Sequence, residues 1–515
     1  MLKKIRVTVS IVFIALITLY FLDFADLLPP SLHWLEKIQF IPALLAINII
    51  IITGLVVLSL IFGRIYCSSV CPMGIYQDVV AWFSKKFKRR KRYTFSKART
   101  ILRWSTLGAV LVAFLFGFTF LLGLLDPYGA YGRMVTHLFR PAYLAGNNLL
   151  ETIFTSFDNY TFYKTGIYLL SLSSTIIAIV TLLGIGFLAW RNGRTYCNTL
   201  CPVGTVLGFL NKFALFKIQF DNENCNSCGL CSMKCKASCI DSKNKKIDYS
   251  RCVNCFNCIE VCNRNAMKYA PVGLVKKKQA ISAPAYTYQK ESRAVDESKR
   301  RFLSATVATG VATTSLLAQK VTNIQNENKI ERKLPIAPPG VVHVDHLREK
   351  CISCHLCVSK CPSHVIKPAL FEYGLGGIMQ PKLYFEYGFC NYDCTVCGDV
   401  CPTGAILPLS VEEKHHTQMG QVVFVKENCI VVTDGTNCGA CSEHCPTQAV
   451  HMVPYKDALT IPETDVSICV GCGGCEYVCP SIPYKAIYVE GLQAQNTIEI
   501  KKEKKEDIVI DDFGF

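Results

Sequence analysis

The cysteines between residues 351 and 480 constrain this chain more than any other feature. Two runs follow the spacing C-x2-C-x2-C-x3-C-P, and two looser runs between them also end in C-x3-C-P. The cysteines of these runs are Cys351, Cys354, Cys357, Cys361, Cys390, Cys394, Cys397, Cys401, Cys429, Cys438, Cys441, Cys445, Cys469, Cys472, Cys475 and Cys479. This is the ligand spacing of [4Fe–4S] ferredoxins, in which the fourth cysteine of a run binds the neighbouring cube. The region is therefore predicted to hold four [4Fe–4S] clusters.

Other uses of closely spaced cysteines fit this region less well. Structural zinc is satisfied by four ligands and does not need a third close cysteine followed by C-x3-C-P. Disulfides do not need such regular spacing. Residues 351–355 also match the C-x-x-C-H haem attachment signal, but they lie within a complete ferredoxin run. Iron–sulfur ligation is the interpretation that accounts for all four runs.

Composition points to a membrane protein and away from nucleic acid. The chain has 515 residues, 50% of them hydrophobic, and a net charge of +16. That charge would fit nucleic-acid binding, but much of it lies in one loop, residues 85–99, between apolar segments. Basic loops beside membrane spans are the simpler explanation, so no nucleic-acid partner is predicted.

Four apolar segments are each about long enough to cross a bilayer as a helix. They are residues 7–24, 39–62, 101–125 and 167–190. The basic residues 85–92 place the loop between the second and third segments in the cytoplasm. The loops at residues 25–38 and 126–166 are then external. The expected fold class is a membrane α-helical domain of four spans, joined to α+β domains of the bacterial-ferredoxin type.

An internal repeat, G-R-x-Y-C-x3-C-P-x-G, occurs at residues 63–74 and 193–204. Each copy follows a pair of predicted spans, so both are expected on the cytoplasmic side. Cysteines four residues apart share one face of a helical turn, so the two copies can place four thiols around one point. We call Cys67, Cys71, Cys197 and Cys201 the elbow cysteines. They predict a further iron–sulfur centre, another metal site or a redox-active dithiol; the alternative is a packing motif.

A compact two-cluster ferredoxin follows the fourth span. Crossed ligation predicts that cluster one takes Cys225, Cys228, Cys231 and Cys262, and that cluster two takes Cys252, Cys255, Cys258 and Cys235. Lys236 and Asn263 stand where the closing prolines are expected. Cys239 remains outside every group of four and is expected to be a small buried residue.

Residues 298–303, Ser-Lys-Arg-Arg-Phe-Leu, precede a mildly apolar stretch and resemble a twin-arginine export signal. The alternative is a basic stop before a weak helix. Export would make this stretch a fifth, weak span and would place the last cluster domain outside. The predicted parts are a membrane domain 1–215, a cytoplasmic ferredoxin 216–272, a linker 273–297, the signal or anchor 298–320, a linker 321–347, the four-cluster domain 348–490 and a charged tail 491–515.

The helical part with its two C-x3-C-P motifs and following ferredoxin resembles NapH, NosR and the CcoG-like membrane polyferredoxins. The second half has an arginine-rich signal, a Pro-Pro-Gly segment at residues 338–340 and four cluster motifs. It is similar to the NapG and MauM ferredoxins. The chain therefore looks like two such proteins joined.

The resemblance to NapH and NapG implies an electron-transfer subunit of the quinol dehydrogenase type in the bacterial inner membrane. Menaquinol would be oxidised, and electrons would pass through six [4Fe–4S] clusters, or seven with the elbow cysteines, to an extracytoplasmic reductase or electron-carrier protein. The four-cluster domain would be periplasmic. Candidate quinol-site residues in the external loops are His33, Trp34, Asp126, Tyr128, His137 and Arg140. Each also fits an ordinary interfacial belt.

Two other functions stay open at this stage. The CcoG-like resemblance implies a metal-ion reductase or an assembly factor for a metalloenzyme, with the elbow cysteines as its reactive groups. Alternatively, a cytosolic ferredoxin feeds electrons to the chain for export without a quinone. No G-x-G-x-x-G fingerprint lies beside a βαβ unit, so direct NADH oxidation is not expected.

Overall fold

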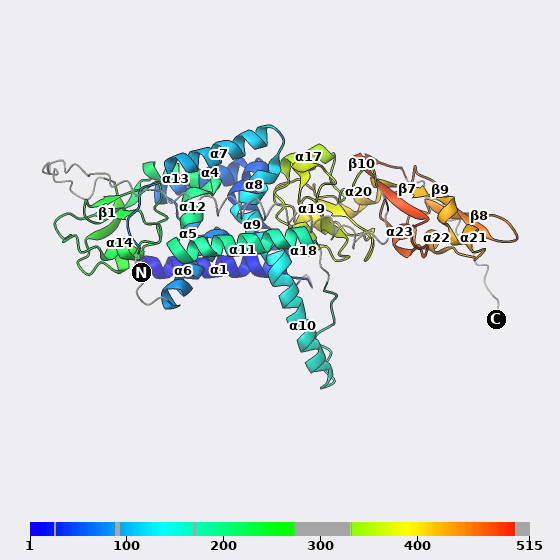
Figure 1. Ribbon diagram of the computed structural model, residues 1–515, viewed down its shortest axis with the longest axis horizontal. Helices are drawn as coiled ribbons and strands as arrows, with labels where there is room; N and C mark the ends of the chain where they lie inside the picture. The colour runs from blue at the N-terminus through cyan, green and yellow to red at the C-terminus, as the bar shows by residue number, and fades with distance from the viewer. Residues whose placement is uncertain (25–26, 88–92, 168–170, 273–329, 331, 500–515) are drawn as a thin grey trace, which may run out of the picture.

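The computed structural model describes residues 1–24, 27–87, 93–167, 171–272, 330 and 332–499. Three parts follow one another along the long axis (Figure 1). The first ferredoxin domain, residues 216–272, lies at one end, the helical body in the middle and the C-terminal cluster domain at the other end. The predicted twin-arginine-like segment and the linker before it fall outside the described residues.

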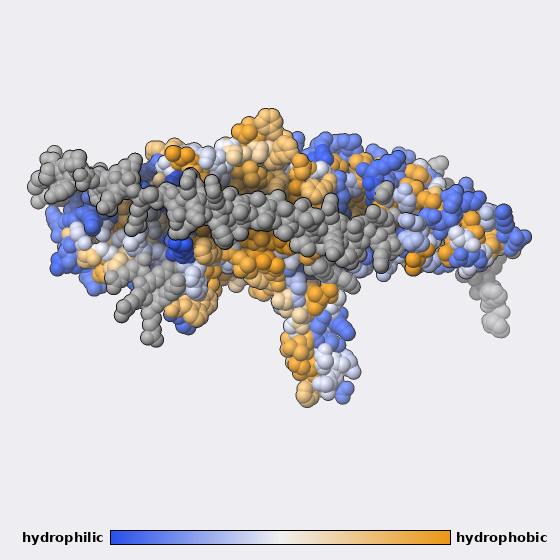
Figure 2. Space-filling model, in the orientation of Figure 1, coloured by the Kyte–Doolittle hydropathy of each residue, from blue (hydrophilic) through white to orange (hydrophobic). Residues whose placement is uncertain are grey.

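Two helices in the described part of the chain are long and apolar enough to cross a membrane, α1 (Leu2–Leu22) and α11 (Leu172–Asn192). Both run along the long axis (Figure 1). Val180, Leu183 and Phe187 on α11 are exposed, and the apolar surface of the helical body lies between two more hydrophilic ends (Figure 2). An exposed apolar surface of this kind fits a surrounding bilayer.

The prediction of four full spans is wrong for the second and third segments. Residues 39–62 form α3 (Phe40–Leu45) and α4 (Ile49–Phe62), because Ile47 has a positive φ and Asn48 caps the start of α4. Residues 101–125 form α7 (Thr100–Leu115) and α8 (Thr119–Leu125), which are separated at Gly117, also at positive φ. Neither α4 nor α7 has the roughly 20 residues that a span needs.

The repeated motif forms two matching elbows. In the first, α5 (Tyr66–Ser69) leads through Cys71 into α6 (Pro72–Phe87); in the second, α12 (Thr195–Thr199) leads through Cys201 into α13 (Pro202–Leu210). A proline opens α6 and α13, at the helix position where its missing N–H costs least. The shorter elements of the body are η1 (Pro30–His33), α2 (Trp34–Lys37), α9 (Pro127–Met134), η2 (Val135–Phe139) and η3 (Asn211–Phe213).

One further helix, α10 (Arg140–Thr155), projects sideways from the helical body, across the direction of α1 and α11 (Figure 1). Tyr143, Leu149 and Ile153 are exposed on it, and its surface is apolar along one side and polar along the other (Figure 2). An amphipathic helix in this orientation fits the interface of a bilayer that α1 and α11 cross.

The first ferredoxin domain is built on two small antiparallel ladders. β1 (Phe216–Phe220) pairs with β4 (Met267–Pro271), and β2 (Ile240–Asp241) pairs with β3 (Lys246–Ile247). The short helices α14 (Leu230–Lys234) and α15 (Asn257–Glu260) each follow a residue at positive φ in a cysteine loop. These tight turns let backbone and thiols surround a cluster site.

The C-terminal cluster domain has one core that joins three antiparallel strand pairs. The pairs are β5 (Ile366–Pro368) with β6 (Pro381–Leu383), β7 (Thr417–Phe424) with β10 (Ile487–Thr497), and β8 (Val450–Pro454) with β9 (Thr460–Thr464). Its helices are α17 (Val344–Lys350), α18 (Leu356–Lys360), η4 (Leu375–Gly377), α19 (Val396–Asp399), α20 (Val411–His415), η5 (Lys426–Asn428), α21 (Ile430–Thr433), α22 (Ala440–Glu443) and α23 (Gly474–Val478). Ile336 belongs to the same core and β10 continues past residue 490. The domain therefore extends beyond both predicted bounds.

Candidate iron–sulfur electron-transfer site

The first ferredoxin domain gathers its cysteines into two groups. One pocket is lined by Cys225, Cys228, Cys231 and Cys262, the set expected for cluster one. The thiols of Cys255 and Cys258 lie within electrostatic range of Cys235, as expected for cluster two. Cys239, which the spacing leaves over, is buried with its Sγ 3.5 Å from Cys235 Sγ.

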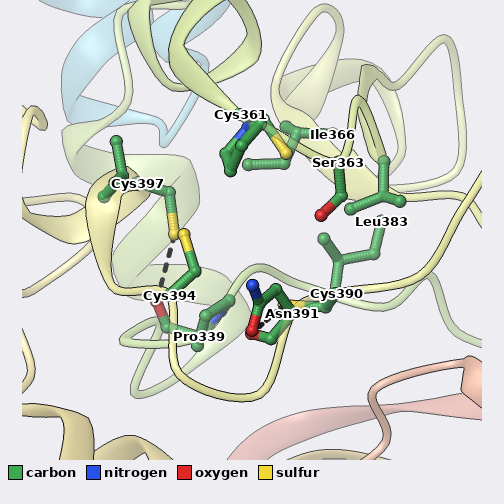
Figure 3. A pocket seen from close by; sticks show the side chains of 12 residues that line it. Pro339, Cys361, Ser363, Ile366, Leu383, Cys390, Asn391, Cys394 and Cys397 are labelled. Carbon is green, nitrogen blue, oxygen red and sulfur yellow. Dashed lines mark hydrogen bonds between the residues drawn. The ribbon is translucent and has the colours of Figure 1, made fainter. Parts of the chain in front are cut away.

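The C-terminal cluster domain forms four such groups, each with three cysteines of one run and one cysteine of another. Site A has Cys351, Cys354, Cys357 and Cys401; site B has Cys390, Cys394, Cys397 and Cys361; site C has Cys469, Cys472, Cys475 and Cys445; site D has Cys429, Cys438, Cys441 and Cys479. Figure 3 shows site B, where Cys361 lies across the pocket from the other three. The looser runs, whose pairing the spacing leaves open, thus follow the same crossed rule.

These four sites lie in a row. Sites A and B exchange cysteines between their runs, and so do sites C and D. Cys390 N of site B donates to Cys472 O of site C over 2.9 Å, so these two sites are neighbours. α18 of site A lies next to the helical body, whereas α21 and α22 of site D lie towards the far end (Figure 1). The order away from the body is A, B, C and D.

The elbow cysteines are buried where the two elbows meet, each only 3% exposed. Arg64 Nη2 lies 3.8 Å from Cys67 Sγ of its own repeat and donates to Cys197 O of the other repeat over 3.3 Å. Arg194 makes the matching contacts: its Nη1 lies 4.0 Å from Cys197 Sγ of its own repeat and donates to Cys67 O of the other repeat over 2.6 Å. Two buried guanidinium groups therefore lie beside the thiols of Cys67 and Cys197 and tie each elbow to the other.

The last glycine of each motif allows this close packing. A Cβ on Gly74 would lie 2.2 Å from Cys67 O, and a Cβ on Gly204 would lie 2.1 Å from Cys197 O. Real Cβ atoms do not approach a carbonyl oxygen so closely. The two glycines are therefore required for the elbow backbone to fold back on its own first cysteine.

Asp78 links the elbows to α1 and to the first ferredoxin domain. Its Oδ1 lies 2.8 Å from Arg194 Nε and 3.3 Å from Lys236 Nζ, and its Oδ2 lies 2.9 Å from Arg6 Nη1. Burial alone would raise the pKa of Asp78, but the charges of Arg194, Lys236 and Arg6 together hold that pKa well below its ordinary value. Lys236, which replaces the expected closing proline, is therefore a docking residue.

The other half of the first ferredoxin domain contacts Arg64 of the first elbow, Asn211 directly after the second elbow, and Phe62 at the end of α4. Arg64 Nη1 donates to Ser250 O over 3.1 Å, and Asn211 Nδ2 donates to Cys252 O over 3.1 Å. Asn254 Nδ2 donates to Phe62 O over 2.6 Å. Because Cys252 belongs to the cluster-two group, cluster two is the site that faces the elbows.

At its other end the helical body holds site A. Arg133, which is fully buried, donates to Ser353 O over 3.0 Å and to Gly123 O over 3.0 Å. Lys360 Nζ forms an ion pair with Asp23 at 2.7 Å, with both side chains only 6% exposed. These contacts fasten the loop between Cys351 and Cys361 onto the end of α1 and onto α8 and α9.

One continuous core runs between the two docked domains. It contains the four elbow cysteines and Cys354 of site A, and Cys255 of the first ferredoxin domain packs against it. The motif tyrosines lie within this core: Tyr66 OH donates to Gln39 Oε1 over 2.9 Å, and Tyr196 OH donates to Leu125 O over 2.7 Å. The elbows therefore lie between cluster two and site A.

Four of the six residues expected at a quinol site lie near the contact with the C-terminal cluster domain. Asp126 Oδ2 accepts from Gly129 N over 2.6 Å, and burial raises the pKa of Asp126 to about 6. Tyr128 is buried within electrostatic range of Cys354. His137 Nε2 lies 2.7 Å from His355 Nδ1. Arg140 lines a small pocket with His364.

The other two expected residues lie apart, beside α1, and they lead to a residue that the sequence reasoning missed. His33 Nδ1 lies 3.2 Å from Tyr20 OH, and the ring of Trp34 lies 6.1 Å from that of Phe13. Glu36 follows in α2 and is 1% exposed. Its sequence signal is an acidic residue close to the apolar residues 39–62, where charge is costly.

The donor set fits iron–sulfur clusters. Thiolates are the ligands of [4Fe–4S] cubes, and N–H groups directed at their sulfurs stabilise them. At the elbows, Arg64 Nε and Arg194 Nη2 are buried without a hydrogen-bond partner among the described residues. Within those residues no group of three or more His, Cys, Asp or Glu side chains is placed to hold a single metal ion. The elbow cysteines would hold a cube between the two guanidinium groups.

Comparisons with known families agree with these sites. A model described as a 4Fe-4S binding domain matches residues 44–90 and 174–221, which contain the two elbows. Models described as 4Fe-4S dicluster domains match residues 350–406 and 435–482. The chain is a ferredoxin-type iron–sulfur protein. The expectation of several [4Fe–4S] clusters and of an electron-transfer role is confirmed at this level.

The relatives of this ferredoxin-type protein are distant. The methylamine utilization ferredoxin-type protein MauM of Methylobacillus flagellatus is 31% identical over 156 residues, which are 28% of this chain and 63% of MauM. The ferredoxin-type protein NapH of Escherichia coli is 23% identical over 226 residues, 42% of this chain and 66% of NapH. YccM of Escherichia coli is 24% identical over 223 residues, 43% of this chain and 55% of YccM.

The chain thus covers less than two thirds of the length of each of these three relatives. No solved structure matches. That two such proteins are joined in one chain stays a prediction.

Proposed function

We propose that this protein carries electrons between the first ferredoxin domain and the C-terminal cluster domain by way of the elbow cysteines. The observation that carries the proposal is the single buried core that contains the elbow cysteines and Cys354 and packs against Cys255. One-electron carriers in series form a conducting path, and the protein sets their potentials through burial, charge and hydrogen bonds to sulfur.

The elbow cysteines hold a seventh [4Fe–4S] cluster in this scheme. A cube with four thiolates carries net negative charge, and burying uncompensated charge is costly. Arg64 and Arg194, both within 1% of full burial, supply the opposite charge beside the thiols. The cluster-one, cluster-two and A to D groups hold the other six cubes.

The path crosses the bacterial inner membrane in this proposal. α1 and α11 are the spanning helices, and the first ferredoxin domain is cytoplasmic. The basic residues Lys85 and Lys86 lie in the last turn of α6, near the elbow end of the body that bears this domain, in agreement with the positive-inside rule. The C-terminal cluster domain is then periplasmic, and α10 lies at the membrane surface on that side.

Menaquinol is the proposed donor, and the acceptor is an extracytoplasmic reductase or electron-carrier protein that meets the end of the row at site D. The relationship to NapH supports an electron-transport role, and the apolar surface of the helical body (Figure 2) gives a lipid-soluble donor access. The protein is then an electron-transfer subunit of a quinol dehydrogenase.

A second candidate is electron exchange with a soluble cytoplasmic carrier, such as a ferredoxin, at cluster one. Cys228 is exposed, and its pocket lies in the domain at the free end of the molecule. By contrast, the 3% exposure of each elbow cysteine does not favour direct reduction of metal ions from solution.

The proposal is tested with the double variant Cys67→Ser, Cys201→Ser in the full chain. We expect about 24 irons per chain in the variant against about 28 in the wild type. With an impermeant low-potential reductant on the cytoplasmic side of vesicles and quinol absent, sites A to D should be reduced in the wild type only. Cys239→Ser is the matched control and keeps all irons and the transfer. Unchanged iron content and transfer in the double variant would refute the path.

A further inference from the structure

The segment of residues 30–45 runs back along α1 towards the elbows. His33 Nδ1 lies 3.2 Å from the hydroxyl of Tyr20, near the end of α1. The ring of Trp34 packs on that of Phe13, which precedes Tyr20 by about one third of the length of α1. Gln39 then reaches Tyr66 of the first elbow, at 2.9 Å. This segment therefore lies at membrane depth, between the lipid-facing surface and the buried core.

Glu36 is the unexplained residue of this segment. It is 1% exposed, and neither of its carboxylate oxygens has a hydrogen-bond partner among the described residues. Its closest ionic neighbour is His33, with 3.6 Å between Glu36 Oε1 and His33 Nδ1. A buried acid without a hydrogen-bond partner is costly, and such groups within a membrane domain mark proton or ion pathways.

The surroundings of Glu36 join a cluster site to the lipid phase. Tyr128 is within electrostatic range of both Glu36 and Cys354 of site A. Trp34 is 47% exposed on the outer surface of the body, and the His33 side chain is 26% exposed. A lipid-soluble molecule at Trp34 would thus have an acid, a histidine and an electron acceptor close by.

We propose that Glu36 and His33 accept the two protons of a lipid-soluble hydroquinone that is oxidised beside site A. Two O–H bonds of the hydroquinone break; one proton goes to Glu36 and one to His33. Its two electrons leave one at a time to the one-electron iron–sulfur acceptor at site A, and the quinone is released. The partly exposed His33 passes the protons to the external side. This assignment rests on the quinol donor of the proposed function.

The charges around Glu36 set the pH at which it works. Lys37 of its own helix and Lys360 of α18 are the cations that act on its carboxylate. The other titratable groups near it are His33 and Tyr128 of α9, and Tyr20 of α1 lies beside His33. Since only the ionised carboxylate accepts a proton, the oxidation rate of the wild type should depend on pH.

The test compares Glu36→Gln with the wild type, as full chains with all clusters in liposomes, with a short-chain menaquinol analogue as the donor. We expect the variant to be reduced by the analogue on the order of 100-fold more slowly, with a pH profile that differs from that of the wild type. Quinone binding, followed by tryptophan fluorescence, and full reduction by dithionite should be kept. Asp158→Asn, an exposed acid just after the end of α10, is the control and should behave as the wild type.

The outcomes separate this inference from the proposed function. A wild type that dithionite reduces but the analogue does not reduce removes quinol as the donor, and the role of Glu36 with it. If the analogue reduces the wild type and the Glu36→Gln variant at the same rate and with the same pH profile, only the role of Glu36 is overturned, and quinol stays the donor. If the Glu36→Gln variant loses iron, the same measurement is made on the His33→Gln variant. Slower quinol oxidation in that variant supports the site, and an unchanged rate overturns it.

Discussion

Asp78→Asn is the substitution whose effect the structure specifies best. The carboxylate is 8% exposed and holds three cations, Arg194 at 2.8 Å, Arg6 at 2.9 Å and Lys236 at 3.3 Å. An amide of the same shape removes the negative charge that these three cations share. Removing one partner of a buried ion pair costs about 3–5 kcal/mol. We expect a loss of stability of at least this size, together with a weaker hold on the first ferredoxin domain.

The assay is thermal unfolding of the full chain in detergent, with iron content measured on the same samples. Glu260→Gln is the matched control, because Glu260 pairs with Lys3 of α1 across the same contact but is more than half exposed on its side chain. That pair should contribute about 0–1 kcal/mol. If the Asp78→Asn variant unfolded at the same temperature as the Glu260→Gln variant, the buried ion cluster would not hold the domains together.

The sign of the pH dependence follows from the depressed pKa of Asp78. A carboxyl whose pKa is lower in the folded protein contributes stability above its unfolded pKa and loses it as the pH falls through the folded value. Because the folded pKa is well below the ordinary value, the difference between the wild type and Asp78→Asn should be constant from pH 5 to 8 and shrink only below about pH 4.

Two further predictions concern the same contacts. Gly204→Ala places a Cβ 2.1 Å from Cys197 O. This substitution should lower the stability by about 1–3 kcal/mol and release the elbow irons, whereas the control Gly54→Ala, with nothing within 4 Å of its Cβ, should do neither. Equal iron contents in the two variants would contradict this prediction. Arg133→Lys loses part of the hydrogen bonding to Ser353 O and Gly123 O. It should weaken the docking of site A by about 2–3 kcal/mol, which would appear as a lower Tm and as slower reduction of sites A to D. A variant with the Tm and the reduction rates of the wild type would refute this prediction.

The cysteine groups were the most predictable part of this molecule. Ligand spacing is a local property, and the crossed pairing follows because the fourth cysteine of each run leaves its own loop. The pocket of Cys225, Cys228, Cys231 and Cys262 is the group that the spacing predicts. The same rule extends to the looser run with Cys429, whose partner Cys479 comes from the last run.

The membrane spans and the buried Glu36 were less predictable from the sequence. An apolar count does not register single residues that end a helix, such as Asn48 as an N-cap or Gly117 at positive φ. The sequence shows Glu36 only as an acid close to an apolar stretch, because its burial depends on residues 30–45 lying against α1. Lys236 appears in the sequence as a departure from the ferredoxin pattern, and only its ion pair with Asp78 explains it.

The difference between the two repeats explains how one ferredoxin domain docks in a single orientation. The position four residues after the motif glycine is Asp78 in the first repeat and Gly208 in the second. Asp78 binds Lys236, whereas Gly208 leaves room for Ser250 O, which would lie 2.4 Å from a Cβ at that position. Two identical elbows would offer the ferredoxin domain, with its two similar cysteine runs, two equivalent ways to dock. With one acid and one glycine, only the orientation that brings Lys236 to Asp78 satisfies both contacts, and this orientation places Cys252 of cluster two, rather than cluster one, against the elbows.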